Sequence, residues 1–182
     1  MKNIKPFLMA VTVVIAGTLA GCSSPPTKAA DVTESIRTSL AQANLKDVSV
    51  SQDRDKGVVT LSGHVAVESD KVQAESIAKS FSGTQVVANQ IAVTPVGGEA
   101  DAKKVNSALD EGIANNLEAA LIKAKLRDGV KSSVKNQVVT LTGEVNSQAK
   151  RAETEKVAAA VPNVQQVVNE LQVKGQKATS SK

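Results

Sequence analysis

Aromatic residues are nearly absent from this sequence. It has no Trp or Tyr, and its two Phe include Phe7 in the N-terminal segment, which leaves Phe81 as the single aromatic side chain of the remaining chain. Stacking platforms for bases or sugars are therefore missing, which argues against binding of single-stranded nucleic acid or glycans. The hydrophobic core has to be built from Val, Leu, Ile and Ala.

The residues that most often carry enzymatic and metal chemistry are also scarce. The sequence has one Cys and one His, Cys22 and His64. No Cys and His spacing matches a zinc site, and no phosphate-binding loop, nucleophile elbow or dinucleotide motif is present. We therefore expect no catalytic residues, no metal and no cofactor. An enzyme with an unrecognised site is the weakest of the alternatives.

An internal repeat is the main feature that the sequence does contain. Residues 58–65 read VVTLSGHV, residues 138–145 read VVTLTGEV, and the match continues without a gap to Val93 and Val173. Self-similarity at a fixed period indicates one structural unit used twice. Each unit has roughly 65 residues, a size that buries only about 60% of its unfolded surface, so we expect modest stability per unit.

The N-terminal segment has the pattern of an export signal. In residues 1–21 a positive start precedes an apolar run that is shorter than the roughly 20 residues of a membrane span. The residues LAGC at 19–22 resemble the lipobox of bacterial lipoproteins, L-[AS]-[GA]-C. The resemblance implies cleavage between Gly21 and Cys22 and a covalent lipid on the Cys22 thiol. The alternative is a plain secretory leader followed by a free cysteine.

The residue after the cysteine bears on localisation. Ser23, in place of Asp, implies sorting to the outer membrane under the rule for Gram-negative lipoproteins. Acyl chains contribute about 0.8 kcal/mol per buried CH₂, so such an anchor is effectively permanent. We expect a protein anchored by lipid at the outer membrane with its domains in the periplasm. Residues 22–30, which contain two prolines, are expected to form an extended tether.

Hydrophobic periodicity within one unit predicts the order helix, strand, strand, helix, strand. In the first unit we expect a helix over 31–45, strands at 48–50 and 58–67, a helix over 69–81 and a last strand over 85–93. The second helix is expected to bury a face that includes Phe81. The strands joined through that helix should be parallel, because a helical crossover carries the chain back to the end of the sheet at which the preceding strand began.

Two residue types recur inside the strands of both units. Gly63 and its repeat Gly143 interrupt the main strand, which indicates a bulge or a close approach by the packed helix. Asn89 and Asn169 lie among inward-facing valines, and a buried amide has to be hydrogen-bonded. We expect each Asn to bond a neighbouring loop rather than a ligand, so all four residues are interpreted as structural.

The combined pattern is similar to that of the BON domain (bacterial OsmY and nodulation). It consists of V-x-L-x-G-x-V, a helix with a basic start and an E-x-x-A core, and V-x-N-x-[IL]-x-V. The resemblance implies an α+β fold of two tandem BON domains, each αββαβ with a small three-stranded mixed sheet packed on two helices. It also implies no enzymatic activity, and a role in phospholipid binding and in protecting the envelope under osmotic or other stress.

This resemblance gives the expected organisation of the chain. We place BON domain 1 at 31–94, a linker at 95–105, BON domain 2 at 106–174 and a disordered tail at 175–182.

The helix that opens the second unit supplies the candidate binding site. It is predicted over 101–126, as one bent helix or two because Gly112 interrupts it, and its end is basic. Cations are favoured at helix C-termini by the dipole, which is the structural explanation. The functional explanation is an amphipathic docking face, in which each lysine contributes about 1 kcal/mol near anionic headgroups. The candidate phospholipid-binding residues are Leu117, Leu121, Lys123, Lys125 and Arg127.

Charge separates the two units. Residues 103–174 carry eleven Lys and Arg against eight Asp and Glu, whereas residues 31–94 carry six against eight. The net charge of +4 falls to +2 without Lys2 and Lys5 of the leader, which is too weak to indicate nucleic acid. The expected partners are therefore membrane phospholipids and, second, envelope proteins, with no nucleic acid and no small-molecule substrate. The alternative function is a periplasmic protein-binding adaptor or holdase chaperone that uses exposed apolar edges.

Overall fold

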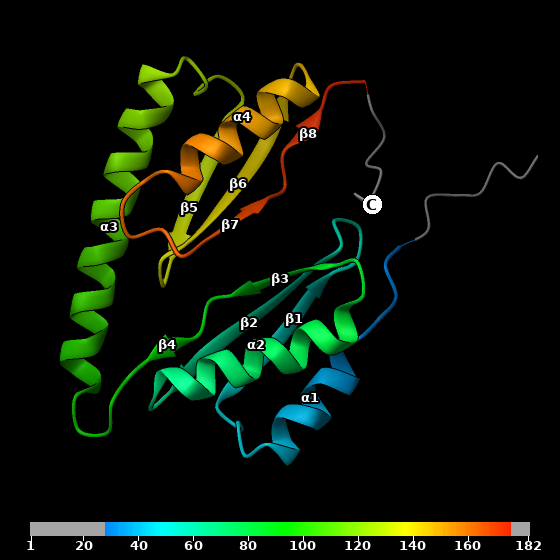
Figure 1. Ribbon diagram of the computed structural model, residues 1–182, viewed down its shortest axis with the longest axis vertical. Coiled ribbons are helices and arrows are strands. Elements are labelled where there is room, and N and C mark those ends of the chain that lie inside the picture. The colour runs from blue at the N-terminus through cyan, green and yellow to red at the C-terminus, as the bar shows by residue number, and fades with distance from the viewer. Residues whose placement is uncertain (1–27, 176–182) are drawn as a thin grey trace, which may run out of the picture.

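The computed structural model of the protein describes residues 28–175, so the predicted leader, Cys22 and the end of the tail lie outside the described residues. The chain forms two units with the same order of elements (Figure 1). The first unit consists of α1 (Thr33–Gln42), β1 (Val48–Asp53), β2 (Val58–Val65), α2 (Glu68–Ser82), β3 (Val86–Asn89) and β4 (Ala92–Val93). The second consists of α3 (Glu99–Lys123), β5 (Val130–Lys135), β6 (Val138–Val145), α4 (Gln148–Ala159), β7 (Gln166–Asn169) and β8 (Gln172–Val173).

Each unit has a small mixed sheet around one central strand. In the first unit β1 pairs antiparallel with β2, while β3 and β4 both pair parallel with β2 on its other side. The second unit repeats this arrangement around β6. The predicted αββαβ fold is confirmed. The expected last strand differs in one respect, because in each unit it is divided into two short strands.

The side chain of Asn89 explains the division of the strand in the first unit. Its Oδ1 accepts a hydrogen bond from the backbone N–H of Ile91 at 3.3 Å, which replaces a bond of the strand ladder. Its Nδ2 donates to the carbonyl of Lys71 at 3.3 Å and to Oε2 of Glu75 at 3.0 Å. The amide therefore bonds helix α2, where a neighbouring loop was expected.

Asn169 makes the same three hydrogen bonds in the second unit. It accepts from Leu171 N–H at 3.2 Å and donates to the carbonyl of Arg151 at 3.2 Å and to Oε2 of Glu155 at 2.8 Å. The recurrence of Glu and Asn at the same spacing in both units is thus the signature of one network that ties the split strand to the second helix.

The carboxylate in this network is held in its charged form in the first unit. Burial raises the pKa of Glu75, but the hydrogen bond from Asn89 and the ion pair with Lys79 outweigh that effect, so the pKa lies below its usual value of 4.5.

Gly63 and Gly143 lie where two backbone segments approach each other. The φ of Gly63 is +104°, and a Cβ there would lie 2.0 Å from the carbonyl oxygen of Asp47. The φ of Gly143 is +116°, and a Cβ there would lie 2.2 Å from the carbonyl oxygen of Gly129. The close approach is made by the chain that enters β1 or β5, and not by the packed helix as one prediction had it.

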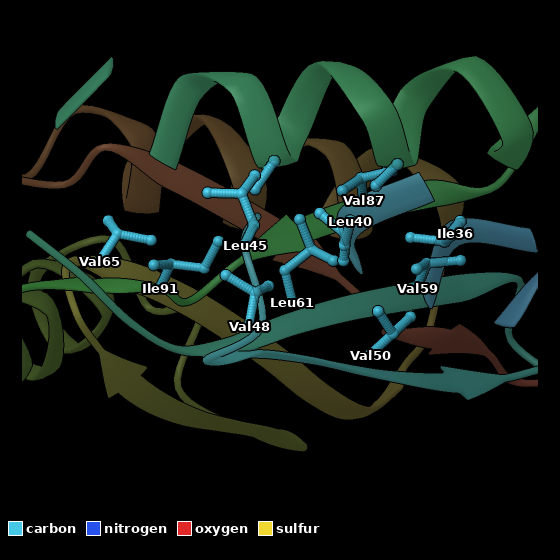
Figure 2. Packing of buried hydrophobic residues seen from close by; sticks show 12 residues of the cluster. Ile36, Leu40, Leu45, Val48, Val50, Val59, Leu61, Val65, Val87 and Ile91 are labelled. Carbon is cyan, nitrogen blue, oxygen red and sulfur yellow. The ribbon is translucent and has the colours of Figure 1, made fainter. Parts of the chain in front are cut away.

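The core of the first unit lies between its sheet and its two helices. Val59 and Leu61 of β2 are fully buried and meet Ile36 and Leu40 of α1 (Figure 2). The prediction for Phe81 was wrong, because its side chain is 41% exposed. The face of α2 that turns inward follows Lys71, Ala74, Ala78 and Ser82 at helical spacing, and Phe81 lies off that line.

The long helix α3 is a single uninterrupted element of 25 residues, which decides between the two predicted forms. The N-terminal turns of α3, by which it is longer than α1, are hydrogen-bonded to the turn between β5 and β6. The Asp110 carboxylate accepts hydrogen bonds from the backbone N–H groups of Asn136 at 2.7 Å and Gln137 at 2.8 Å. Both turn residues have positive φ, so the carboxylate holds an otherwise unfavourable turn in place.

The last residues of the predicted tether pack onto the first unit. Ala29 exchanges hydrogen bonds with Arg54 in the β1–β2 turn, and the carbonyl of Ala30 accepts from Gln52 at 2.7 Å. The ordered fold therefore starts before residue 31.

The two units pack through equivalent surfaces. A buried apolar cluster joins Val58 and Ala88 of the first unit to Val138 and Val168 of the second, and these are matching positions of the repeat. The edges of β3 and β7 face each other across this joint (Figure 1). The interface is therefore self-complementary, in the manner of a two-fold dimer built into one chain.

The contacts at the rim of this interface are also matched. Lys56 Nζ lies 2.6 Å from Oε2 of Glu170, and at the matching place Asn136 donates to the carbonyl of Gln90 at 2.8 Å. The ion pair on one side of the interface thus corresponds to a neutral hydrogen bond on the other side of the interface.

Candidate functional site

The structure places two of the five candidate residues in the interior. Leu117 and Leu121 are fully buried in the core of the second unit, where no membrane can reach them. The prediction for these two residues was wrong. An apolar stripe at spacing i, i+4 marks the face of an amphipathic helix that packs on its own sheet as well as one that docks on a membrane.

Arg127 is engaged within the fold. Its Nε donates to Oε1 of Glu118 at 2.6 Å, and its guanidinium also donates to the carbonyl of Val130. The side chain thus ties the end of α3 to the start of β5. These contacts give Arg127 a structural role, and its binding of phospholipid headgroups stays a prediction.

Lys123 and Lys125 are exposed, and neither forms an ion pair or a side-chain hydrogen bond with any residue between 28 and 175. Lys125 has a φ of +58° and reverses the chain directly after the helix. Both ammonium groups are therefore available for an external anion.

Ile122 is the residue that the sequence analysis missed. Its side chain is 58% exposed, although it is large and apolar and directly precedes Lys123. The signal that could have found it is its position, since it lies off the stripe defined by Leu117 and Leu121. We call Ile122, Lys123 and Lys125 together the α3 tip.

The matching helix end of the first unit has the same geometry. Equivalent pairs of positions are Leu40 and Leu121, Asn44 and Lys125, and Leu45 and Leu126. The two leucine pairs are buried in both units, and Asn44 has a φ of +60° where Lys125 has +58°.

The residues of the α3 tip are nevertheless different in chemistry from their counterparts. The positions of Ile122, Lys123 and Lys125 are taken in the first unit by Ala41, Gln42 and Asn44. A helix dipole would favour cations at both helix ends. Because the first unit has none there, the fold does not require the apolar and basic side chains of the α3 tip.

An apolar groove of about 380 Å³ lies between α3 and α4, on the side of α3 that carries Asn116 and Ala120. Its opposite wall includes Val157, Val161 and Pro162 of α4 and the turn after it. Lys123 follows Ala120 by three residues, so it lies one helical turn further along the same side. The groove adds apolar surface beside the α3 tip.

Within residues 28–175, no three His, Cys, Asp or Glu side chains lie close enough together to hold a metal ion. In the same part of the chain, no helix combines the length and the apolar character that crossing a bilayer requires.

The model of the BON domain matches residues 28–95 and 109–175. The chain is 30% identical over 149 residues to the osmotically-inducible protein Y of Escherichia coli K12, and the match covers 79% of this chain and 71% of that protein. Two solved structures of CdsD, a structural protein of the type III secretion system of Chlamydia trachomatis, are each 14% identical with a TM-score of 0.32. The chain spans 66% and 63% of those two chains, and a TM-score this low gives no basis for inferring a shared function.

Proposed function

Because this chain belongs to the BON domain family, we propose that it is a non-enzymatic protein of the bacterial envelope, anchored through lipid on Cys22, whose second domain docks on anionic phospholipid through the α3 tip. The observation that carries the proposal is that Ile122, a large apolar side chain, is exposed beside the exposed cations Lys123 and Lys125. Similarity to an osmotically inducible protein supports a role under osmotic stress.

The expected strength of this docking explains why an anchor is needed. Two lysines contribute about 1 kcal/mol each near an anionic surface, and burying one isoleucine contributes about 2 kcal/mol. A total of about 4 kcal/mol corresponds to a dissociation constant on the order of 1 mM. The α3 tip therefore binds weakly by itself, and the lipid anchor makes binding effective by raising the local concentration of membrane.

The repeat offers a matched variant for the test. Replacing the α3 tip with its counterpart residues, Ile122→Ala, Lys123→Gln and Lys125→Asn, removes the apolar and basic groups and keeps the backbone geometry of the first unit. We expect residues 23–182 to co-sediment with phosphatidylglycerol vesicles at millimolar lipid, and the triple variant to bind at least tenfold more weakly.

Salt and lipid composition provide the controls. Binding of the unaltered chain should fall as the Debye length shrinks from about 8 Å at 0.15 M salt to about 3 Å at 1 M. Phosphatidylcholine vesicles should bind little. If the triple variant binds phosphatidylglycerol as well as the unaltered chain does, docking by the α3 tip is refuted and protein partners become the better explanation.

A further inference from the structure

A second site lies at the joint between the two units. A cleft of about 340 Å³ lies between α2 and the start of β7. Its polar lining consists of Glu68, Lys71, Glu75, Lys79, Asn89, Gln165 and Gln166. Its volume lies in the range typical of small-molecule sites, about 300–1,000 Å³.

Lys71 is the unusual residue of this cleft. Its side chain is only 7% exposed, and its ammonium donates to Oε1 of Gln165 at 3.1 Å. An ammonium has three N–H donors, and Lys71 forms no ion pair with any carboxylate of residues 28–175. The Glu75 carboxylate interacts electrostatically with Lys71, but it is bonded to Lys79 and Asn89. A buried ammonium that forms no direct ion pair is a favourable partner for an added anion.

Most of the other polar groups of the cleft already form hydrogen bonds or ion pairs. Glu75 pairs with Lys79 and accepts from Asn89. Gln166 bridges the edge of β3, because its Oε1 accepts from Asn89 N–H at 3.0 Å and its Nε2 donates to the carbonyl of Val87 at 2.6 Å. The bonds of Gln166 thus fix one wall of the cleft to the first unit, and the ammonium of Lys71 has N–H donors to spare.

Comparison with the second unit indicates that the ammonium of Lys71 does not hold the elements of the first unit together. The matching residue of the second unit is Arg151, whose guanidinium donates to the carbonyls of Leu171 at 3.0 Å and Asn169 at 2.9 Å. Arg151 therefore secures the split strand. Lys71 makes no such bond to Asn89 or Ile91, and its ammonium turns to the other unit instead.

The polar lining of this cleft is not fully repeated at the matching place on the other side of the interface. The counterpart of Gln166 is Val86, an apolar residue, and the counterpart of Gln165 is Gln85, which bonds Gln52 and Ala30 within the first unit. Two-fold packing alone would give equal clefts at both sides. The polar contacts of Gln165 and Gln166 with the first unit are therefore specific to this side of the interface.

We propose that this cleft binds a small molecule through one oxyanion group, a phosphate or a carboxylate, that pairs with Lys71. The site is separate from the α3 tip and does not depend on membrane docking. Because the oxyanion would contact Lys71 of the first unit beside Gln165 of the second, its binding favours the arrangement of the two units described above.

Nuclear magnetic resonance of residues 23–182 tests the proposal. The protein is titrated with inorganic phosphate and, separately, with acetate, at an ionic strength held constant with chloride. A single charge-assisted contact is weak, so we expect half-saturation on the order of 10 mM. We expect saturable shifts at the backbone amides of Val72, Asn89 and Gln166, and the titration that produces them identifies the preferred oxyanion.

Two variants make the test specific. Lys71→Met keeps the aliphatic stem and removes the charge, so the shifts should weaken at least tenfold. Lys71→Arg keeps the charge, but by analogy with Arg151 the guanidinium should turn to the carbonyls of Asn89 and Ile91, so binding should also be lost. Lys46→Met, at an exposed position of the same unit, should titrate like the unaltered protein.

The proposal is overturned if neither anion gives saturable shifts around the cleft of the unaltered protein. It is also overturned if Lys71→Arg binds as well as the unaltered protein, since general electrostatic attraction would then explain the shifts. If Lys71→Met does not fold, the unaltered protein and Lys71→Arg still decide the matter.

Discussion

Replacing Gly143 with alanine is expected to destabilise the second unit by at least about 3 kcal/mol. The residue has a φ of +116°, where side chains are strained, and its Cβ would lie 2.2 Å from the carbonyl oxygen of Gly129. The obstacle is backbone on both sides, so no side chain can move away to make room. Denaturant unfolding of residues 23–182, followed by circular dichroism, measures the loss.

Gly112 provides the control for this substitution. It lies inside α3, and a Cβ there would meet nothing within 4 Å. Gly112→Ala is therefore expected to stabilise the helix by about 0.5–1 kcal/mol. An unchanged unfolding midpoint for Gly143→Ala would contradict the close approach of β6 to the chain entering β5.

The second large effect distinguishes two adjacent residues of α3. Leu121→Asp should unfold the second unit, because it places a carboxylate without a partner in the core that Leu121 now fills. Ile122→Asp should leave folding intact, because the side chain of Ile122 is 58% exposed. It should instead abolish binding to anionic vesicles, since it replaces an apolar contact with a like charge.

Circular dichroism and vesicle co-sedimentation of both variants measure these effects. The expected pattern is an unfolded second unit for Leu121→Asp, and a folded chain that no longer binds for Ile122→Asp. The opposite pattern, with Leu121→Asp folded and deficient only in binding, would restore the sequence-based assignment of Leu121 to the membrane surface.

The sequence predicted the fold well because the repeat supplied every signal twice. Alternating valines predicted β2 and β6, and helical spacing predicted the helices. The division of the last strand was not predictable from periodicity. It depends on the Asn89 amide reaching Glu75 and Lys71 of α2, which is a contact between segments that are distant in the sequence.

Docking at the end of α3 stays a prediction, and the structure divides the residues proposed for it into exposed and engaged ones. The basic end of α3 is exposed at Lys123 and Lys125, whereas Leu117 and Leu121 are core and Arg127 is bound to Glu118. Periodicity identifies an apolar face but does not say what covers it. The cleft at Lys71 was not predictable, because it exists only once the two units are packed together.

The most direct test of membrane docking uses the absence of tryptophan from the chain. Residues 22–182 are attached through the Cys22 thiol to a maleimide lipid in phosphatidylglycerol vesicles, and one tryptophan is introduced as Ile122→Trp or, at the matching position, as Ala41→Trp. We predict that the emission of Ile122→Trp shifts to shorter wavelength and returns at high salt, while that of Ala41→Trp remains as in water. An equal shift at both positions, or none at position 122, would contradict docking through the α3 tip.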